Sequence, residues 1–174
     1  VGAAVKAIDA DITATNTTIT TAGDVVCGIS SGKNTTGGSI TLDKVEIGAD
    51  SAKPIYGINA AGGAGKTLKM TDTNVYASGG GVIFCEGDVT MTGGAVTAGG
   101  GFALKTENGA ITVTGTEAAP VVLTAFGATS GVVEAGGSGR YKDALTLRYV
   151  GITAGGAQYG VKAADGKVTA ENVT

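Results

Sequence analysis

Several residue types that most enzymes and wide globular cores depend on are rare or missing in this chain. Its 174 residues include no histidine and no tryptophan, only 2 prolines and 2 cysteines, and aromatic residues make up 5%. Without histidine, the chain cannot form a Ser-His-Asp or Cys-His catalytic arrangement. With so few large side chains it cannot fill a wide core, although Val, Ile, Leu and Ala can fill a narrow one.

The charge and hydropathy of the chain exclude further classes of protein. The net charge is −3, so we expect no nucleic-acid partner, because phosphate binding needs a basic stripe. No apolar run approaches the roughly 20 residues of a membrane-spanning helix, and we expect no membrane insertion. A hydrophobic content of 43% indicates a folded chain in spite of its 32 glycines.

What the chain does contain is a short phrase that returns along its whole length. A polar residue, usually threonine, lies between two apolar residues in Ile12-Thr13-Ala14, Ile40-Thr41-Leu42, Leu68-Lys69-Met70, Val89-Thr90-Met91, Ile111-Thr112-Val113, Leu145-Thr146-Leu147 and Val168-Thr169-Ala170. Successive phrases lie about 26 residues apart on average, which is a solenoid period. This period is too short for most two-helix repeats and fits one turn of a parallel β-helix.

The rest of each repeat supports that interpretation. A second short strand and a glycine-rich corner follow the phrase, as in Val96-Thr97-Ala98-Gly99-Gly100, and a third short strand follows the corner, as in Val82-Ile83-Phe84-Cys85. Such period-2 runs separated by Gly, Asn, Asp and Ser are typical of strands and turns. We therefore predict an all-β, single β-solenoid domain over 1–174, a single-stranded parallel β-helix of about 6–7 coils with about 20–30 residues each.

The alternation within the phrase predicts which side chains face the core. Because a strand has a period of two, the apolar members should point inward and the threonines between them outward. The predicted core residues are Ile40, Leu42, Leu68, Met70, Val89, Met91, Ile111, Val113, Leu145 and Leu147, and the predicted outward residues are Thr41, Thr90, Thr112 and Thr146. The long step between Thr112 and Thr146 predicts an outward loop, at Glu117–Pro120 or at Gly136–Lys142.

The two ends of the chain are more alike than any other pair of repeats. Val, Lys, Ala, Asp, Thr, Ala and Asn of the segment 5–16 recur in the segment 161–172 at one offset of 156 residues. Polar caps normally protect the open strand edges of a solenoid, and neither end shows such a cap. We expect uncapped ends that stack head to tail through Val5, Ile8, Ile12, Ile19, Val161, Val168 and Val173. The alternative is coincidence within a chain rich in Thr and Ala.

The two cysteines are predicted to lie too far apart to bond to each other. Cys27 falls in the third strand of the first coil and Cys85 in that of the third coil, roughly 10 Å apart at about 4.8 Å per coil. A disulfide needs Cα atoms within about 7 Å. The two open alternatives are a pair of buried thiols and an intermolecular disulfide through Cys27 or Cys85.

The Gly-Gly corners, the phrases Val89-Thr90-Met91-Thr92 and Ile111-Thr112-Val113-Thr114 and the coil length resemble right-handed parallel β-helix proteins of the pectin-lyase-like class. Within that class the chain is most similar to bacterial and archaeal surface proteins, such as autotransporter-like passengers and adhesin stalks. More loosely, its Gly/Ala/Thr richness and uncapped ends resemble self-assembling filament and methanogen-type sheath proteins. The resemblance implies a right-handed coil and an extracellular or cell-surface location.

Two other activities associated with β-helices fit the residues less well. Polysaccharide cleavage by hydrolysis needs two carboxyls that flank one bond, and in principle a β-helix could bring Asp43 and Asp72 together on adjacent coils. Solvated corner positions explain these dispersed acids better. Outward threonine columns resemble those of ice-binding solenoids, but Lys69, Arg148 and Glu171 interrupt them, as does Asp43. Threonine is also a good residue on any solvated strand face.

We expect a structural, non-catalytic extracellular protein that polymerises head to tail into a filament or sheath, with itself as partner. We expect no enzyme activity and no catalytic residue, cofactor or metal site. The alternative function is an adhesin or carbohydrate-binding stalk with a polysaccharide as partner; ice binding and polysaccharide cleavage rank behind it. Chance explains the three Asn-x-Thr sequons of this Thr-rich chain better than glycosylation does, at Asn16, Asn34 and Asn172.

Overall fold

A computed structural model describes residues 2–21, 25–32, 37–49, 52–127, 131–136, 143–156, 159–164 and 166–174. These residues form strands, turns and bends without a helix, which confirms the all-β prediction, and the described part therefore holds no helix that could cross a membrane. The strands are β1 (Ala3–Ala7), β2 (Ile12–Ile19), β3 (Cys27–Ser31), β4 (Ile40–Ile47), β5 (Tyr56–Ala77), β6 (Val82–Ala98), β7 (Leu104–Asn108), β8 (Ile111–Thr114), β9 (Val121–Ala125), β10 (Gly131–Ala135), β11 (Asp143–Ala154), β12 (Tyr159–Ala163) and β13 (Lys167–Val173).

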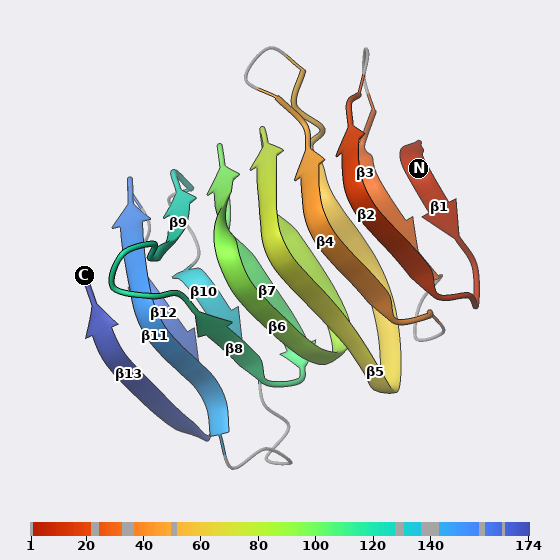
Figure 1. The fold of residues 1–174 in the computed structure, drawn as a ribbon. Helices are drawn as coiled ribbons and strands as arrows, with labels where there is room; N and C mark the ends of the chain where they lie inside the picture. Colours follow the sequence, from red (N-terminus) through yellow and green to blue (C-terminus); the bar gives the residue numbers. More distant parts are fainter. Residues whose placement is uncertain are drawn as a thin grey trace.

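All the strands belong to one 13-stranded sheet, and the pairings between them are parallel. A first row runs in the order β1-β3-β5-β6-β7-β10-β12. A second row joins β2, β4, the later parts of β5 and β6, then β8 and β9, and finally β11 and β13. The chain passes from one row to the other and returns one strand further along, so its two ends lie at opposite ends of the stack (Figure 1).

The repeated phrase forms one column of neighbours in the second row. Its first apolar residue stays in register from strand to strand, through Ile12, Ile40, Leu68, Val89, Ile111, Leu145 and Val168. The sequence period is therefore the length of chain between two neighbouring strands of this row. The many-stranded parallel sheet follows from that repetition.

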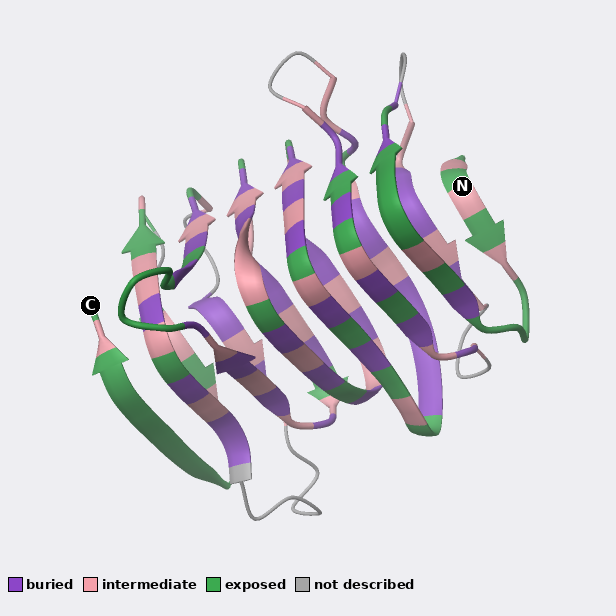
Figure 2. Cartoon of the chain, in the orientation of Figure 1, coloured by how far each residue is buried: buried purple, intermediate pink, exposed green. Residues whose placement is uncertain are grey.

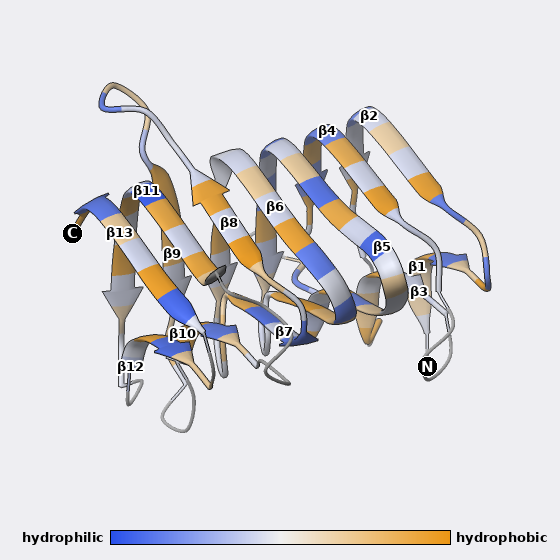
Figure 3. Cartoon of the chain, turned by 90° about the horizontal axis from the view of Figure 1, so that it is seen from below, coloured by the Kyte–Doolittle hydropathy of each residue, from blue (hydrophilic) through white to orange (hydrophobic). Residues whose placement is uncertain are grey.

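The predicted division between core and surface is confirmed. The ten predicted core residues are at most 1% exposed, whereas Thr41 is exposed and Thr90, Thr112 and Thr146 are half-buried. Figure 2 shows this alternation as bands of buried and less buried residues across the central strands, and Figure 3 shows matching hydrophobic and hydrophilic bands. Since each apolar residue packs on its equivalent in the next strand, small aliphatic side chains suffice to fill the interior.

The predicted outward loop lies between β8 and β9. Residues 116–120 are all exposed, and the Thr116 N–H donates a hydrogen bond to the Ala119 carbonyl at 3.0 Å. The loop divides this second-row strand into β8 and β9, at a corner that β6 and β11 cross as continuous strands. The first predicted location, Glu117–Pro120, is therefore confirmed; of the second, residues 137–142 lie outside the described residues.

One corner of the second row has a left-handed backbone in six of its register positions. Their φ angles lie between 44° and 72°, at Asn16, Lys44, Asp72, Gly93, Tyr149 and Asn172. The left-handed region costs most L-residues about 1–2 kcal/mol, whereas Gly, Asn and Asp adopt it more readily. We call these six residues the left-handed corner column. Lys44 and Tyr149 are the two members whose side chains suit it least.

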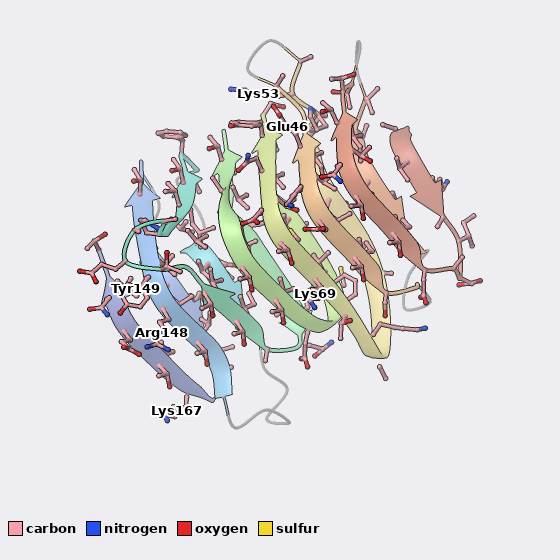
Figure 4. The ribbon with its side chains drawn as sticks, viewed as in Figure 1. Glu46, Lys53, Lys69, Arg148, Tyr149 and Lys167 are labelled. Atoms are coloured by element: carbon pink, nitrogen blue, oxygen red, sulfur yellow. The ribbon has the colours of Figure 1, made fainter. Side chains whose placement is uncertain are left out.

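Replacing Lys44 with Asn should therefore stabilise the fold. The φ of Lys44 is 53°, and Asn occupies this region at lower cost. We expect a gain of about 1 kcal/mol, which for a chain of this size raises the melting temperature by about 2–4 °C. Lys69→Asn is the matched control, because Lys69 is an exposed strand residue outside that column (Figure 4). An equal rise in both variants would assign the gain to the lost charge instead of the backbone.

Candidate functional site

The strands at the two ends of the stack have a neighbour on one side only. Among the described residues, β1 pairs only with β3 and β2 only with β4 at one end. At the other end β12 pairs only with β10, and β13 only with β11. Each end therefore presents a row of backbone N–H and C=O groups without a strand beside it, which is a template for a further strand.

The predicted assembly residues of the first coil lie at the N-terminal edge. Ile12 and Ile19 are 8% and 7% exposed, Val5 is half-buried, and Ile8 is 61% exposed in the turn between β1 and β2. Ile12 and Ile19 belong to the core, where they pack β2 against β4. Ile8 is the large apolar side chain that this end offers to solvent.

The predicted assembly residues of the last coil are more open. Val168 is 46% exposed, although Leu145 and Ile111 in the same column are 0% exposed. Val161 and Val173 are half-buried against the core. In Figure 2 the strand β13 is coloured mainly as exposed, in contrast to its neighbour β11. Among the described residues the apolar column thus continues to β13, where Val168 has no further strand beside it.

The similarity of the two end segments is also a structural equivalence. Val5 and Val161 occupy the same column of the first row, which passes through Ile29, Ile58, Val82, Leu104 and Val133. Thr13 and Thr169 occupy the same column of the second row. Asn16 and Asn172 both belong to the left-handed corner column, with φ angles of 49° and 52°. The offset of 156 residues therefore connects equivalent register positions of the first and last repeats.

The backbone groups at the open C-terminal edge have a defined direction. The Ile12 N–H donates to the Ser39 carbonyl at 2.9 Å, and the Val89 N–H donates to the Ala110 carbonyl at 2.8 Å. Both donors point toward the following coil from the register position that Val168 also occupies. By this equivalence the Val168 N–H points away from β11 and into the open edge.

The outward threonines form the columns that the sequence predicts, with the predicted interruptions. Lys69 stands between Thr41 and Thr90 in one column. In the other, Arg148 and Glu171 are neighbours, and the Arg148 Nε lies 3.3 Å from the Glu171 carboxylate. Figure 4 shows Lys69 and Arg148 on this face. The face is therefore mixed in charge and shape instead of being a flat threonine array.

Both cysteines are free thiols with different accessibility. Cys27 is 0% exposed and Cys85 is half-buried. Burial raises the pKa of the Cys27 thiol; burial also raises the pKa of Cys85, where the carboxylates of Glu107 and Glu86 add to the effect and Lys105 opposes it. Of the two candidates for an intermolecular disulfide, Cys85 is the one that another molecule can approach without opening the fold.

The thiols should therefore react slowly and in a fixed order. We expect a maleimide reagent at neutral pH to modify Cys85 slowly and Cys27 only after unfolding, because the thiolate is the reactive form. Since both pKa values are raised in the fold, the neutral thiols contribute stability that is fully present below the ordinary thiol pKa and is lost as the pH rises through the raised values. Mass spectrometry of the modified peptides measures the order, and equal rates at the two sites would contradict it.

The two acids named as a candidate pair lie on adjacent strands of the second row. Asp43 is the register neighbour of Thr71, and Asp72 follows in the left-handed corner column, so the two acids are diagonal neighbours on adjacent strands. No group of three or more Cys, Asp or Glu side chains in the described part of the chain could hold a metal ion. Of the sequon residues, Asn16 and Asn172 are exposed, and Asn34 lies outside the described residues.

Aromatic side chains gather at the glycine-rich corner, a feature that the sequence analysis missed. A Cβ on Gly80 would lie 2.8 Å from the Phe102 ring and 3.0 Å from the Tyr56 ring, so only glycine lets these two rings lie close to the backbone there. The Lys105 ammonium lies 5.5 Å from the centre of the Phe102 ring and 3.7 Å from the Glu134 carboxylate. The sequence does carry a signal for this aromatic cluster, because aromatic residues and glycines alternate at this position from strand to strand.

The chain matches no known family model, and no curated protein or solved structure is significantly similar to it.

Proposed function

We propose that this protein is a structural, non-catalytic extracellular protein, a right-handed single-stranded parallel β-helix of about seven coils that stacks end to end into a filament or sheath. Each copy adds its first coil to the last coil of another. Because the contact joins two different surfaces, it is head-to-tail and generates an open fibre instead of a two-fold dimer.

The observation that carries the proposal is the equivalence of the first and last coils. Val5, Thr13 and Asn16 occupy the same register positions as Val161, Thr169 and Asn172. A second copy placed beyond β13 would therefore continue each parallel ladder and cover Val168. Burial of uncovered apolar surface and pairing of open strand edges both favour that contact.

Electron microscopy of the purified chain over a range of concentrations tests this function. We expect filaments of uniform width whose mean length increases with protein concentration, together with large particles in light scattering. A chain that stays monomeric at millimolar concentration in both measurements would rule the polymer out.

A carbohydrate-binding stalk is the second candidate, and exposed aromatic residues favour it. Phe126 and Tyr159 are 53% and 52% exposed, and the Lys162 ammonium lies 5.9 Å from the centre of the Tyr159 ring. An amphipathic ring at a surface offers an apolar face and, in tyrosine, a hydrogen-bonding hydroxyl. Retarded migration in a gel that contains polysaccharide, lost in Tyr159→Ala, would support this function, and unchanged migration of the native chain would exclude it.

A further inference from the structure

We infer that the stack between copies has a single register, in which Asn172 of one copy lies beside Asn16 of the next and Lys167 lies beside Asp11. This inference rests on the proposed function and specifies its interface. Strand edges alone do not fix a register, since a strand can slip along its neighbour unless side chains prevent it. The end coils supply two such sets of side chains.

The left-handed corner column supplies the first set of side chains that fixes the register. Within the chain its members in register are Asn16, Lys44, Asp72, Gly93, Tyr149 and Asn172, so no two asparagines are neighbours. Continuing the ladder into a second copy creates the one Asn–Asn contact of the column. Stacked asparagines at one strand spacing donate and accept amide hydrogen bonds along the stack. A slip by one residue would also place a left-handed residue beside an extended one, so the corners themselves resist it.

The charged residues at the two ends supply the second set of side chains that fixes the register. Lys167 begins β13, and Asp11 precedes β2 at the equivalent position, so the stacked register places opposite charges side by side. Asp11 is exposed; its carboxylate accepts a hydrogen bond from the Ser39 N–H at 2.7 Å and lies 3.7 Å from the Lys66 ammonium, so in the stack Lys167 would share this acid with Lys66. The same register brings Lys162 beside Lys6, which is a repulsive pair. In this register Lys167 therefore faces an acid, whereas Lys162 faces another lysine.

Engineered cysteines test the register directly. Thr13 and Thr169 become outward-facing neighbours in the stack, at about 4.8 Å, within the Cα range of a disulfide. We expect oxidation of the double variant Thr13→Cys/Thr169→Cys to yield a ladder of covalent multimers. The control Thr13→Cys/Glu171→Cys moves one cysteine by two strand residues, beyond disulfide reach, and the native chain reports any contribution of Cys27 and Cys85.

The outcomes separate this inference from the proposed function. Multimers in the Thr13/Thr169 pair and not in the Thr13/Glu171 pair support the single register. Filaments without cross-linking of the first pair, or with cross-linking of the second pair alone, overturn the register and leave the polymer standing. Absence of filaments from the native chain overturns both.

A matched pair of charge reversals gives an independent readout. Lys167 and Lys162 both lie in the last repeat, in β13 and β12, and each is replaced by glutamate. In the stack, Lys167→Glu faces Asp11 and should raise the critical concentration for assembly about two- to fivefold. Lys162→Glu faces Lys6 and should lower it by a similar factor. Shifts of the same sign in the two variants would overturn the inferred register.

Discussion

Replacing Leu145 with Asp is expected to abolish folding. Leu145 is 0% exposed and packs in the column between Ile111 and Val168. An aspartate there would place an unpaired carboxylate in an aliphatic interior, at a cost of several kcal/mol in addition to the lost apolar contacts. The whole stability of a domain is about 5–15 kcal/mol. Circular dichroism should show loss of the β-sheet signal, with the protein recovered in the insoluble fraction.

Thr146→Asp is the matched control for that experiment. Thr146 is the next residue of the same strand, and its side chain faces outward between Thr112 and Thr169. Its aspartate stays solvated, so this variant should fold with little change in melting temperature. If Thr146→Asp unfolds while Leu145→Asp folds, the inward and outward faces of β11 have been exchanged.

Replacing Val168 with Pro is expected to stop filament growth and leave the single chain folded. The Val168 N–H points into the open edge, so the proline removes a donor that another copy needs but that β13 does not use internally. The proline ring also occupies the space of the incoming strand. Leaving the partner carbonyl of the incoming strand unpaired costs about 1–3 kcal/mol, which corresponds to a rise in critical concentration of about five- to a hundredfold. Analytical ultracentrifugation measures that rise, and circular dichroism confirms the fold.

Val168→Thr controls for the loss of the valine side chain, because it keeps the amide and the branched shape. This variant should still form filaments, at a critical concentration only a few times higher. Proline at Ile12 is less informative, since the Ile12 N–H bonds to Ser39 within the chain and its loss loosens the first coil itself. Unimpaired filament growth in Val168→Pro would mean that the C-terminal edge is not the growing surface.

The sequence predicts the all-β class, the core columns and the loop near Glu117, because each depends on spacing alone. A period of two divides Leu145 from Thr146, and the returning apolar-Thr-apolar phrase aligns Leu145 with Ile111 even though the step between them is longer than the average period. The equivalence of Val5 and Val161 can be predicted for the same reason, since the segments around these two residues repeat each other.

The left-handed corner column could not be predicted in this way. Its members are of five residue types, and Lys44 and Tyr149 have no preference for a positive φ. The corner is imposed by the direction in which the next strand must continue, which no single residue encodes. The direction of the Val168 N–H is equally invisible in the sequence, because it depends on which way the backbone groups of β13 face. At the aromatic corner near Gly80 the alternation of aromatic residues and glycines is visible in the sequence, but the contacts of the Tyr56 and Phe102 rings depend on how three neighbouring strands come together.

The loop between β8 and β9 has a mechanical consequence. Interstrand hydrogen bonds run along the stacking direction, so a pull along that direction is shared by all the bonds between two neighbouring strands, while every successive pair of strands carries the same total load. Extension then begins at the weakest step. Between β8 and β9 the left-handed corner is replaced by an exposed loop, so this repeat pairs with β6 and β11 through two short separate ladders, whereas β5 pairs with β6 through one continuous ladder from Thr67 to Ala77. Under tension we therefore expect β8 and β9 to separate from their neighbours in two small steps, before the continuous second-row strands open.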